Sequence, residues 1–173
     1  MTAYAGRARE FLLAYKEDGV VALRRPLGAA LAASVRAVLA AESGPVAIVP
    51  VPSSAAARRR RGHDHVADLA RVATVLLRAE GRAVHQVKAL RHARRVADSA
   101  GLTAAQRAAN LAGAFMVRAS SRAQLAGAVV VVVDDLVTTG VTLTECADAL
   151  RTVGADVRAV ATVAATSRRM RGG

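Results

Sequence analysis

Residues 129–142 read VVVVVDDLVTTGVT. The five valines are too few to cross a membrane, and such a run is typical of a strand that is buried on both faces of a parallel sheet. Two carboxylates, Asp134 and Asp135, end this strand, and a loop of Thr and Gly residues follows before an amphipathic stretch. This order predicts a place that can hold a sugar phosphate. The alternative is a chance acidic pair and turn after a core strand.

The loop after the acidic pair has the groups that a phosphate requires. Backbone N–H groups and hydroxyls at the start of a helix can cradle a phosphate dianion, and Gly140 lets the backbone approach it closely. The two carboxylates can take ribose hydroxyls or a bridged Mg²⁺ ion. No Gly-Lys-Thr/Ser follows a glycine-spaced run, which excludes a Walker loop. No Gly-x-Gly-x-x-Gly opens a helix, so a dinucleotide fold has no fingerprint.

Hydrophobic periodicity predicts the other elements. We expect strands at residues 46–51, 84–90, 128–133 and 157–163. We expect helices over residues 27–39, after the capping residue Asp64, over residues 103–110, and from Leu143 to a stop at Gly154. The helix after Asp64 has an apolar stripe that we expect to be buried, formed by Val66, Leu69, Ala70, Ala73, Leu76 and Leu77. Residues 91–101 are basic and contain a glycine, so an exposed loop is expected there.

Strands that alternate with helices predict an α/β fold with a central, mostly parallel sheet flanked by helices. Ligands bind such sheets beyond the carboxyl ends of the strands. Polar loops follow two of the expected strands, at residues 50–64 and 134–142. The two loops are therefore expected to meet at one site.

The chain of 173 residues, 53% of them hydrophobic, can bury one core, so a single domain over residues 1–173 is expected. Within it, residues 1–25 form an N-terminal helical segment and residues 167–173 a basic tail. The one cysteine, Cys146, excludes an internal disulfide and is expected to be a small core residue. No apolar run approaches about 18 residues and no secretory signal is visible, so we expect no membrane insertion and a cytoplasmic protein.

A net charge of +12 attracts phosphorylated ligands and nucleic acid alike. Most of the arginines suit a solvated surface, but Arg58 to Arg61 stand directly after the 46–51 strand. Guanidinium groups fork onto phosphate oxygens in pairs, so this run can meet a pyrophosphate; the alternative is a solvated basic loop. His63 and His65 lack a third ligand for zinc. We expect them to contact phosphate or to serve loop polarity.

The segment 129–142 resembles the phosphoribosyl-pyrophosphate (PRPP) loop of the type I phosphoribosyltransferases, in which an apolar strand and two acidic residues precede T-[TS]-G-x-T. The resemblance implies that fold, with a flexible loop over the site, and Mg²⁺ as cofactor. It implies that Asp134 and Asp135 act on the ribose diol, help to place the metal and are catalytic. It also implies that the 5′-phosphate is held by Val137, Thr138, Thr139, Gly140, Val141 and Thr142.

A narrower resemblance is to the competence-associated ComF family of phosphoribosyltransferase-like proteins. VPVP at residues 49–52, a basic run and then Arg61-Gly62 match that family, whereas His63, Asp64 and His65 replace its usual Phe-Asn-Gln. The N-terminal segment that ends at Gly19, with Lys16 before the glycine, is also similar. Later matches are Arg91, Arg94, Leu102, Arg107, Asn110, Gly113, Ala114 and Phe115. Ser99 and Val96 depart from the usual Gln and Thr. The N-terminal four-cysteine zinc module of many relatives is lacking.

These resemblances imply transfer of a phosphoribosyl group from PRPP to an unidentified acceptor, a base or an amine, with release of pyrophosphate. Arg60 and Arg61 would meet the pyrophosphate, Ser53 would bind substrate, and Arg91, Arg94 and Arg95 would lie on the mobile loop, with Arg94 catalytic. Users of 6-oxopurines carry Asp where Thr138 stands, so hypoxanthine and guanine are expected to be poor acceptors. The alternative is a non-catalytic nucleotide- or PRPP-binding accessory factor in DNA uptake or repair, with DNA or a competence-machinery protein as partner. For either function, a homodimer is a further expectation.

Overall fold

The structure is a computed structural model that describes residues 2–93 and 111–165. Four parallel strands form the central sheet in the order β2-β1-β5-β6. They are β1 (Val46–Pro50), β2 (Val84–Gln86), β5 (Val129–Val137) and β6 (Asp156–Ala165). A separate antiparallel pair is formed by β3 (Leu90–His92) and β4 (Phe115–Val117). The predicted α/β class with a parallel sheet is confirmed.

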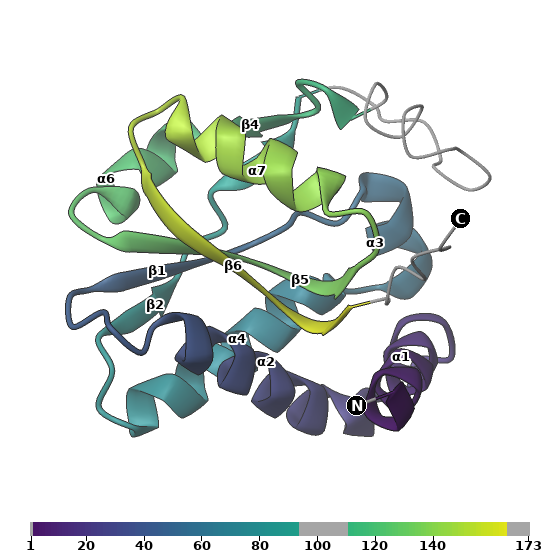
Figure 1. The fold of residues 1–173 in the computed structure, drawn as a ribbon. Coiled ribbons are helices and arrows are strands. Elements are labelled where there is room, and N and C mark those ends of the chain that lie inside the picture. Colours follow the sequence, from purple (N-terminus) through teal and green to yellow (C-terminus); the bar gives the residue numbers. More distant parts are fainter. Residues whose placement is uncertain (1, 94–110, 166–173) are drawn as a thin grey trace, which may run out of the picture.

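Helices cover both faces of the sheet (Figure 1). On one face lie α2 (Arg24–Val38) and α4 (His65–Ala79), and on the other lies α7 (Val141–Arg151). The N-terminal helix α1 (Thr2–Glu17) contacts the ends of β5 and β6. Shorter pieces are η1 (Val21–Leu23), α3 (Ala55–Arg61), η2 (Ala119–Ser121) and α6 (Arg122–Leu125). Among the described residues, none of the helices is long and apolar enough to cross a membrane.

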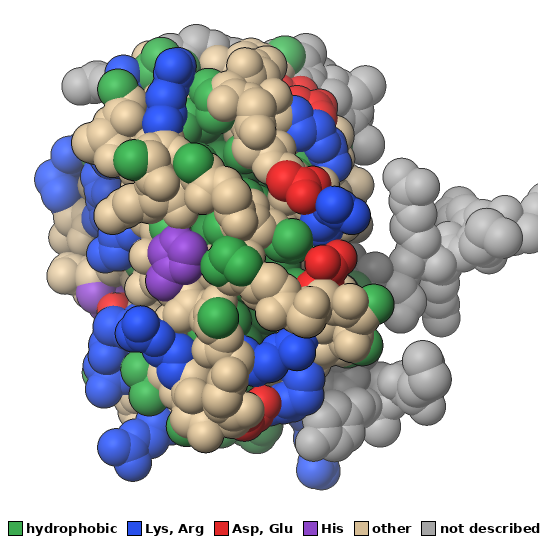
Figure 2. Space-filling model, turned by 90° about the vertical axis from the view of Figure 1, so that its left-hand side faces the viewer, with side chains coloured by type: hydrophobic (Ala, Val, Ile, Leu, Met, Phe, Trp, Pro, Cys, Tyr) green, Lys and Arg blue, Asp and Glu red, His purple; other side chains and the backbone are tan. Residues whose placement is uncertain are grey.

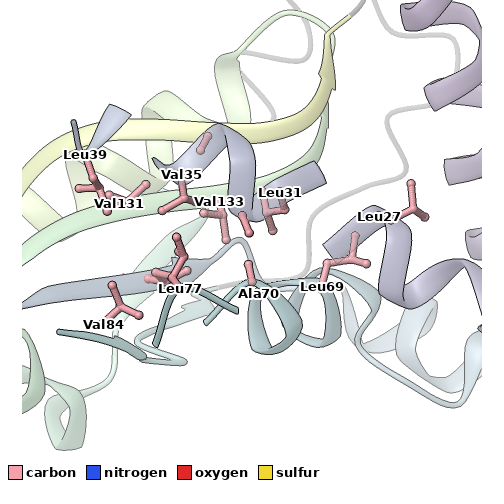
Figure 3. Packing of buried hydrophobic residues seen from close by; sticks show 14 of the residues in the cluster. Leu27, Leu31, Val35, Leu39, Leu69, Ala70, Leu77, Val84, Val131 and Val133 are labelled. Atoms are coloured by element: carbon pink, nitrogen blue, oxygen red, sulfur yellow. The ribbon is translucent and has the colours of Figure 1, made fainter. Parts of the chain in front are cut away.

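The larger core lies between α2, α4 and the sheet (Figure 3). Leu31 and Val35 of α2 meet Leu69 of α4 over Val131 and Val133 of β5, all fully buried. The two helices approach closely where Gly28 of α2 faces Val72 of α4. A Cβ added at that glycine would lie 2.5 Å from Val72 Cβ, so only glycine fits there without a shift of the helices.

The second core lies between the sheet and α7. Val130 and Val132 point to this face, because successive side chains of a strand point to opposite sides. Cys146 and Leu150 of α7 cover them and are fully buried, as the sequence predicts for the cysteine. The valine run of β5 therefore serves two cores at once, which explains why it lacks polar positions.

Several sequence expectations need correction. β5 does not end at residue 133 but continues to Val137, because β6 pairs with it as far as Ala165. The expected strand at 84–90 is two strands in different sheets, β2 and β3, and the expected loop from residue 91 begins as strand. Leu76 was expected to be buried but is 36% exposed. The expected helix at 103–110, most of the mobile loop and the basic tail lie outside the described residues.

Candidate functional site

Three cavities lie around α3, which follows β1. The central cavity, of about 290 Å³, is lined by Lys16, Ser53, His65, Asp134, Asp135 and Thr138. The arginine cavity, of about 580 Å³, is lined by Ser53, Ser54, Arg58, Arg59, Arg91 and Arg118. The α1 cavity, of about 330 Å³, is lined by Lys16, Glu17, Arg60, Arg61 and His63. Pro52 and Ser53 line both of the first two cavities, so these adjoin. The predicted meeting of the loops after β1 and β5 is confirmed, since Ser53 and Thr138 line one cavity.

The two carboxylates at the end of β5 have different surroundings. Asp135 lies on the α4 side of the strand, and its side chain is only 4% exposed. Its Oδ2 lies 2.5 Å from Lys16 Nζ of α1 and 2.8 Å from His65 Nε2, at the first residue of α4. Asp134 Oδ1 instead accepts a hydrogen bond from the backbone N–H of Asp135, at 2.9 Å. One carboxylate therefore has two side-chain partners and the other is held by the backbone.

Electrostatics separates the two carboxyls further. Burial raises the pKa of Asp134, and the neighbouring charge of Asp135 raises it more. Burial alone would also raise the pKa of Asp135, but the hydrogen bond from His65 and the charge of Lys16 outweigh that effect and lower it. Asp135 is therefore firmly ionised, whereas Asp134 holds its proton more tightly than an ordinary carboxyl. Neighbouring acids with opposed pKa shifts are typical of functional sites.

His65 is fixed by contacts on both sides of its ring. Its Nδ1 lies 3.4 Å from Ser53 Oγ and 3.4 Å from a guanidinium nitrogen of Arg61, a group that can only donate. The Arg61 contact places a lone pair on Nδ1, and the other ring nitrogen, Nε2, faces Asp135 Oδ2 at 2.8 Å. Ser53 donates its own proton to Asp64 Oδ1 at 3.0 Å. The expectation that His65 serves loop polarity is wrong, because it is buried and positions Asp135.

The helix after His65 begins as predicted. Asp64 is the N-cap of α4, and its carboxylate accepts the N–H of Ala67 at 3.3 Å. The same carboxylate oxygen accepts the Ser53 hydroxyl, so the cap also fixes the loop after β1. His63 lies differently from His65, with its ring against that of Tyr15 at 5.6 Å between centroids. Among the described residues, no group of three or more His, Cys, Asp or Glu side chains is placed to hold a metal ion.

The loop after β5 leads into the N-terminus of α7, which has no side-chain cap. Gly140 is the N-cap of α7, with a φ of +79° that favours glycine, and it offers no side-chain cap. The first N–H groups of a helix have no intrahelical acceptor, so those of Val141, Thr142 and Leu143 can take an anion. Thr139, Val141 and Thr142 are half-buried and Thr138 is exposed. The five predicted loop residues from Thr138 to Thr142 therefore lie together at the start of α7.

The arginine run divides between two cavities. Arg58 and Arg59 line the arginine cavity, where they are joined by Arg91 of β3 and by Arg118. Arg60 and Arg61 line the α1 cavity and both bind Glu17 of α1, at 3.3 and 2.8 Å. A pyrophosphate that contacts Arg60 or Arg61, as the sequence predicts, has to compete with this carboxylate. Arg94 and Arg95 lie outside the described residues.

The four arginines of the arginine cavity form no ion pair within residues 2–93 and 111–165. At the opposite end of the sheet, some acidic and basic side chains lie side by side (Figure 2). That end contains the ion pairs Arg36–Glu80, Arg151–Asp148 and Arg158–Asp156. Among the described residues, the arginine cavity therefore gathers four arginines that have no acidic partner.

Lys16 and His65 are the site residues that sequence reasoning missed. Asp135 was treated as a second ligand for diol or metal, beside Asp134. A usable signal was the alternation of side chains along the strand, which places Asp135 on the face opposite to Asp134. A carboxylate on a buried face requires a cation or donors. The chain has only two lysines, Lys16 and Lys88, so the search for that cation would have been short.

Comparison with known protein families identifies one match. The family model described as a phosphoribosyl transferase domain matches residues 23–172. The match includes β1, β5 and the loops that follow them, and it begins after α1. No curated protein was found to match the chain.

Proposed function

This chain belongs to the phosphoribosyl transferase domain family, and on that premise we propose that it transfers a phosphoribosyl group from PRPP to an acceptor and releases pyrophosphate. The observation that carries the proposal is the adjacency of two cavities at Ser53. One contains the acidic pair and part of the loop before α7, and the other gathers arginines that form no ion pair with the rest of the described chain. A sugar with a phosphate at one end and a pyrophosphate at the other requires such an arrangement.

The 5′-phosphate is assigned to the start of α7. Backbone N–H groups there and the hydroxyls of Thr139 and Thr142 are the donors, and the sign of the helix dipole favours a dianion. Asp134 is assigned to the ribose hydroxyls, because it lines the central cavity and its partner Asp135 is already bound by Lys16 and His65. Val137, Thr138, Gly140 and Val141 complete this part of the site.

The pyrophosphate is assigned to Arg58, Arg59 and Arg91, beside Ser53. The sequence-based assignment was to Arg60 and Arg61, but those two bind Glu17, whereas Arg58 and Arg59 have no acidic partner among the described residues. Guanidinium groups here would bind the pyrophosphate of PRPP and also stabilise the charge that develops on it in the transition state. Arg94 and Arg95 stay in the proposal as residues of the loop that closes over the ligand.

Magnesium fits this site as an ion bound largely through the oxygens of PRPP. Asp134 would be the protein carboxylate nearest to it. Its pKa is raised in the free protein, and a cation beside it would lower that pKa and favour the ionised form. Asp135 fits less well as a direct ligand, since its buried Oδ2 already contacts Lys16 and His65. When bound, the ion neutralises charge on the leaving pyrophosphate.

A second function, from another class, also has an observation in its favour. The arginines of the arginine cavity, which have no acidic partner in the described part of the chain, could bind nucleic acid, as expected of a non-catalytic accessory factor in DNA uptake or repair. Membership of the ComF family would favour that role, as would a partner in the competence machinery. Aromatic residues for base stacking are scarce, at 2% of the chain, so we rank this function second.

Paired variants of the arginine run test the proposal. Arg58→Ala with Arg59→Ala should weaken Mg²⁺-PRPP binding about 100-fold, since each charged hydrogen bond lost costs about 1.5 kcal/mol or more. Binding of AMP, which has the 5′-phosphate but no pyrophosphate, should change little. Arg60→Ala with Arg61→Ala is the matched control and should affect PRPP much less. Calorimetry measures the affinities of the intact protein and of both variants for each ligand.

The opposite ranking of the two variants would restore Arg60 and Arg61 as the pyrophosphate ligands, with Glu17 displaced. Equal losses for PRPP and AMP, or a salt-dependent loss of DNA binding alone, would favour the accessory role. The acceptor is sought by assaying pyrophosphate release from PRPP with a panel of bases and amines. Hypoxanthine and guanine should be poor, because the Thr138 hydroxyl cannot serve as a general base as a carboxylate does.

A further inference from the structure

Lys16 reaches the site from outside the region that the family model matches. That match begins at residue 23, whereas Lys16 lies in the last turn of α1. Its Nζ lies 2.5 Å from Asp135 Oδ2, and its side chain is 21% exposed. It lines the central cavity and also the α1 cavity. A residue outside the matched region thus contributes a cation to the centre of the site.

Residues on both sides of Lys16 fix its position. The Glu17 carboxylate forms ion pairs with the guanidinium groups of Arg61, at 2.8 Å, and Arg60, at 3.3 Å. These pairs join the end of α1 to α3. Tyr15, 1% exposed, packs its ring against His63. These contacts hold the end of α1 against the rest of the fold. The ammonium group of Lys16 is therefore in position before a ligand binds.

The contacts of Lys16 leave it donors for a ligand. An ammonium group has three N–H donors, and within the described residues Asp135 Oδ2 is its one ionic acceptor. Without Lys16, the central cavity would present an anion with two acidic residues, Asp134 and Asp135. With Lys16, the charge of Asp135 is balanced, and an anionic group can enter beside it.

We propose that Lys16 is a substrate-binding residue that donates to an oxygen of the pyrophosphate group of PRPP. The inference rests on the proposed function, because it takes PRPP as the ligand. The choice of pyrophosphate follows from the neighbours: the 5′-phosphate has the start of α7, and the cavity of Lys16 adjoins the arginine cavity at Ser53. α1 is then part of the site, and its removal removes a binding group.

Neutral variants of the two lysines test the proposal. Lys16→Met should weaken PRPP binding at least about tenfold, the value of one charged hydrogen bond. Its effect on ribose 5-phosphate, which lacks the pyrophosphate, should stay within about twofold. Lys88→Met, at an exposed position, is the matched control and should change neither affinity. Equal losses for both ligands, or no loss for PRPP, would overturn the assignment.

A second measurement uses the unaltered protein, so it does not depend on the variant folding. Competitive acylation followed by mass spectrometry reports the reactivity of Lys16 and Lys88 separately. Saturating Mg²⁺-PRPP should suppress labelling of Lys16 several-fold and leave Lys88 unchanged, and ribose 5-phosphate should protect neither. PRPP that binds without protecting Lys16 would refute the inference alone. Absence of PRPP binding in calorimetry would remove the proposed function together with it.

Discussion

Asp134 and Asp135 are adjacent in the sequence, yet the two faces of β5 give them opposite electrostatic states. On the α4 face, Lys16 and His65 hold Asp135 ionised. On the α7 side, Asp134 has the backbone N–H of its neighbour and a raised pKa. The comparison teaches that two adjacent acidic residues on a strand can have different surroundings and different roles, because their side chains point to opposite faces of the sheet.

This division has a consequence for roles. Asp135 already has its partners in the free protein, so its main contribution is to join α1, α4 and β5 at the cavity floor. Asp134 is partly buried and has no ion-pair partner among the described residues, and a ligand with hydroxyls or a metal ion relieves the cost of that burial. We therefore expect Asp134 to favour ligand binding at the expense of stability, and Asp135 to favour stability.

The largest effect is expected from breaking the α4-side contacts. Asp135→Asn leaves the Lys16 ammonium without its counter-ion and should lower the free energy of unfolding by about 3 kcal/mol, as when one partner of a buried ion pair is removed. Urea denaturation measures the change. Asp148→Asn, whose carboxylate pairs with Arg151 on the surface, is the control and should cost less than about 1 kcal/mol. Similar losses in both variants would mean that Asp135 is not a structural anchor.

A smaller effect of opposite sign is expected on the other face. Asp134→Asn removes a carboxyl whose ionised form is disfavoured by burial and by Asp135, and it should raise the free energy of unfolding at pH 8 by about 1 kcal/mol. The same denaturation experiment reports it. A destabilised Asp134→Asn protein would place this carboxylate among the structural contacts and abolish the contrast.

The smallest and most specific effect concerns pH. A raised folded-state pKa means that the native state binds the proton of Asp134 more tightly than the unfolded state. Its stabilising contribution is therefore complete below the ordinary carboxyl pKa and is lost as pH rises through the raised value. Asp135 has the reverse sign, because its lowered pKa gives stability above the ordinary value that is lost on acidification.

Melting temperatures from pH 4 to pH 9 separate these contributions. The unaltered protein should lose stability between the ordinary carboxyl pKa and the raised pKa of Asp134, and Asp134→Asn should flatten that decline. Parallel profiles for the two proteins would argue that the carboxyl is not perturbed by its surroundings.

The sequence predicted what depends on local pattern. The valine run gave a buried parallel strand, Asp64 a helix cap and Cys146 a core position, because each follows from periodicity or capping chemistry within a few residues. The meeting of the loops after β1 and β5 followed from the geometry of parallel sheets.

Contacts between distant segments were not predicted. The residues near Lys16 in the sequence do not indicate that it pairs with Asp135. The basic run does not indicate that Glu17 forms ion pairs with Arg60 and Arg61 but not with Arg58. β5 was expected to end at the acidic pair, because charged residues rarely continue a central strand. It continues because, within the fold, Lys16 balances the charge of Asp135 and His65 contacts the same carboxylate.

The most direct test of PRPP binding at this edge of the sheet is one calorimetric titration, carried out on the intact protein and on Asp134→Asn. With Mg²⁺ present, we expect one PRPP to bind per intact chain. In the variant we expect at least about tenfold weaker binding despite a more stable fold, since a hydrogen bond to a charged group is worth about 1.5 kcal/mol or more. An intact protein that takes up no PRPP, or a variant with unchanged affinity, would contradict the assignment of this site.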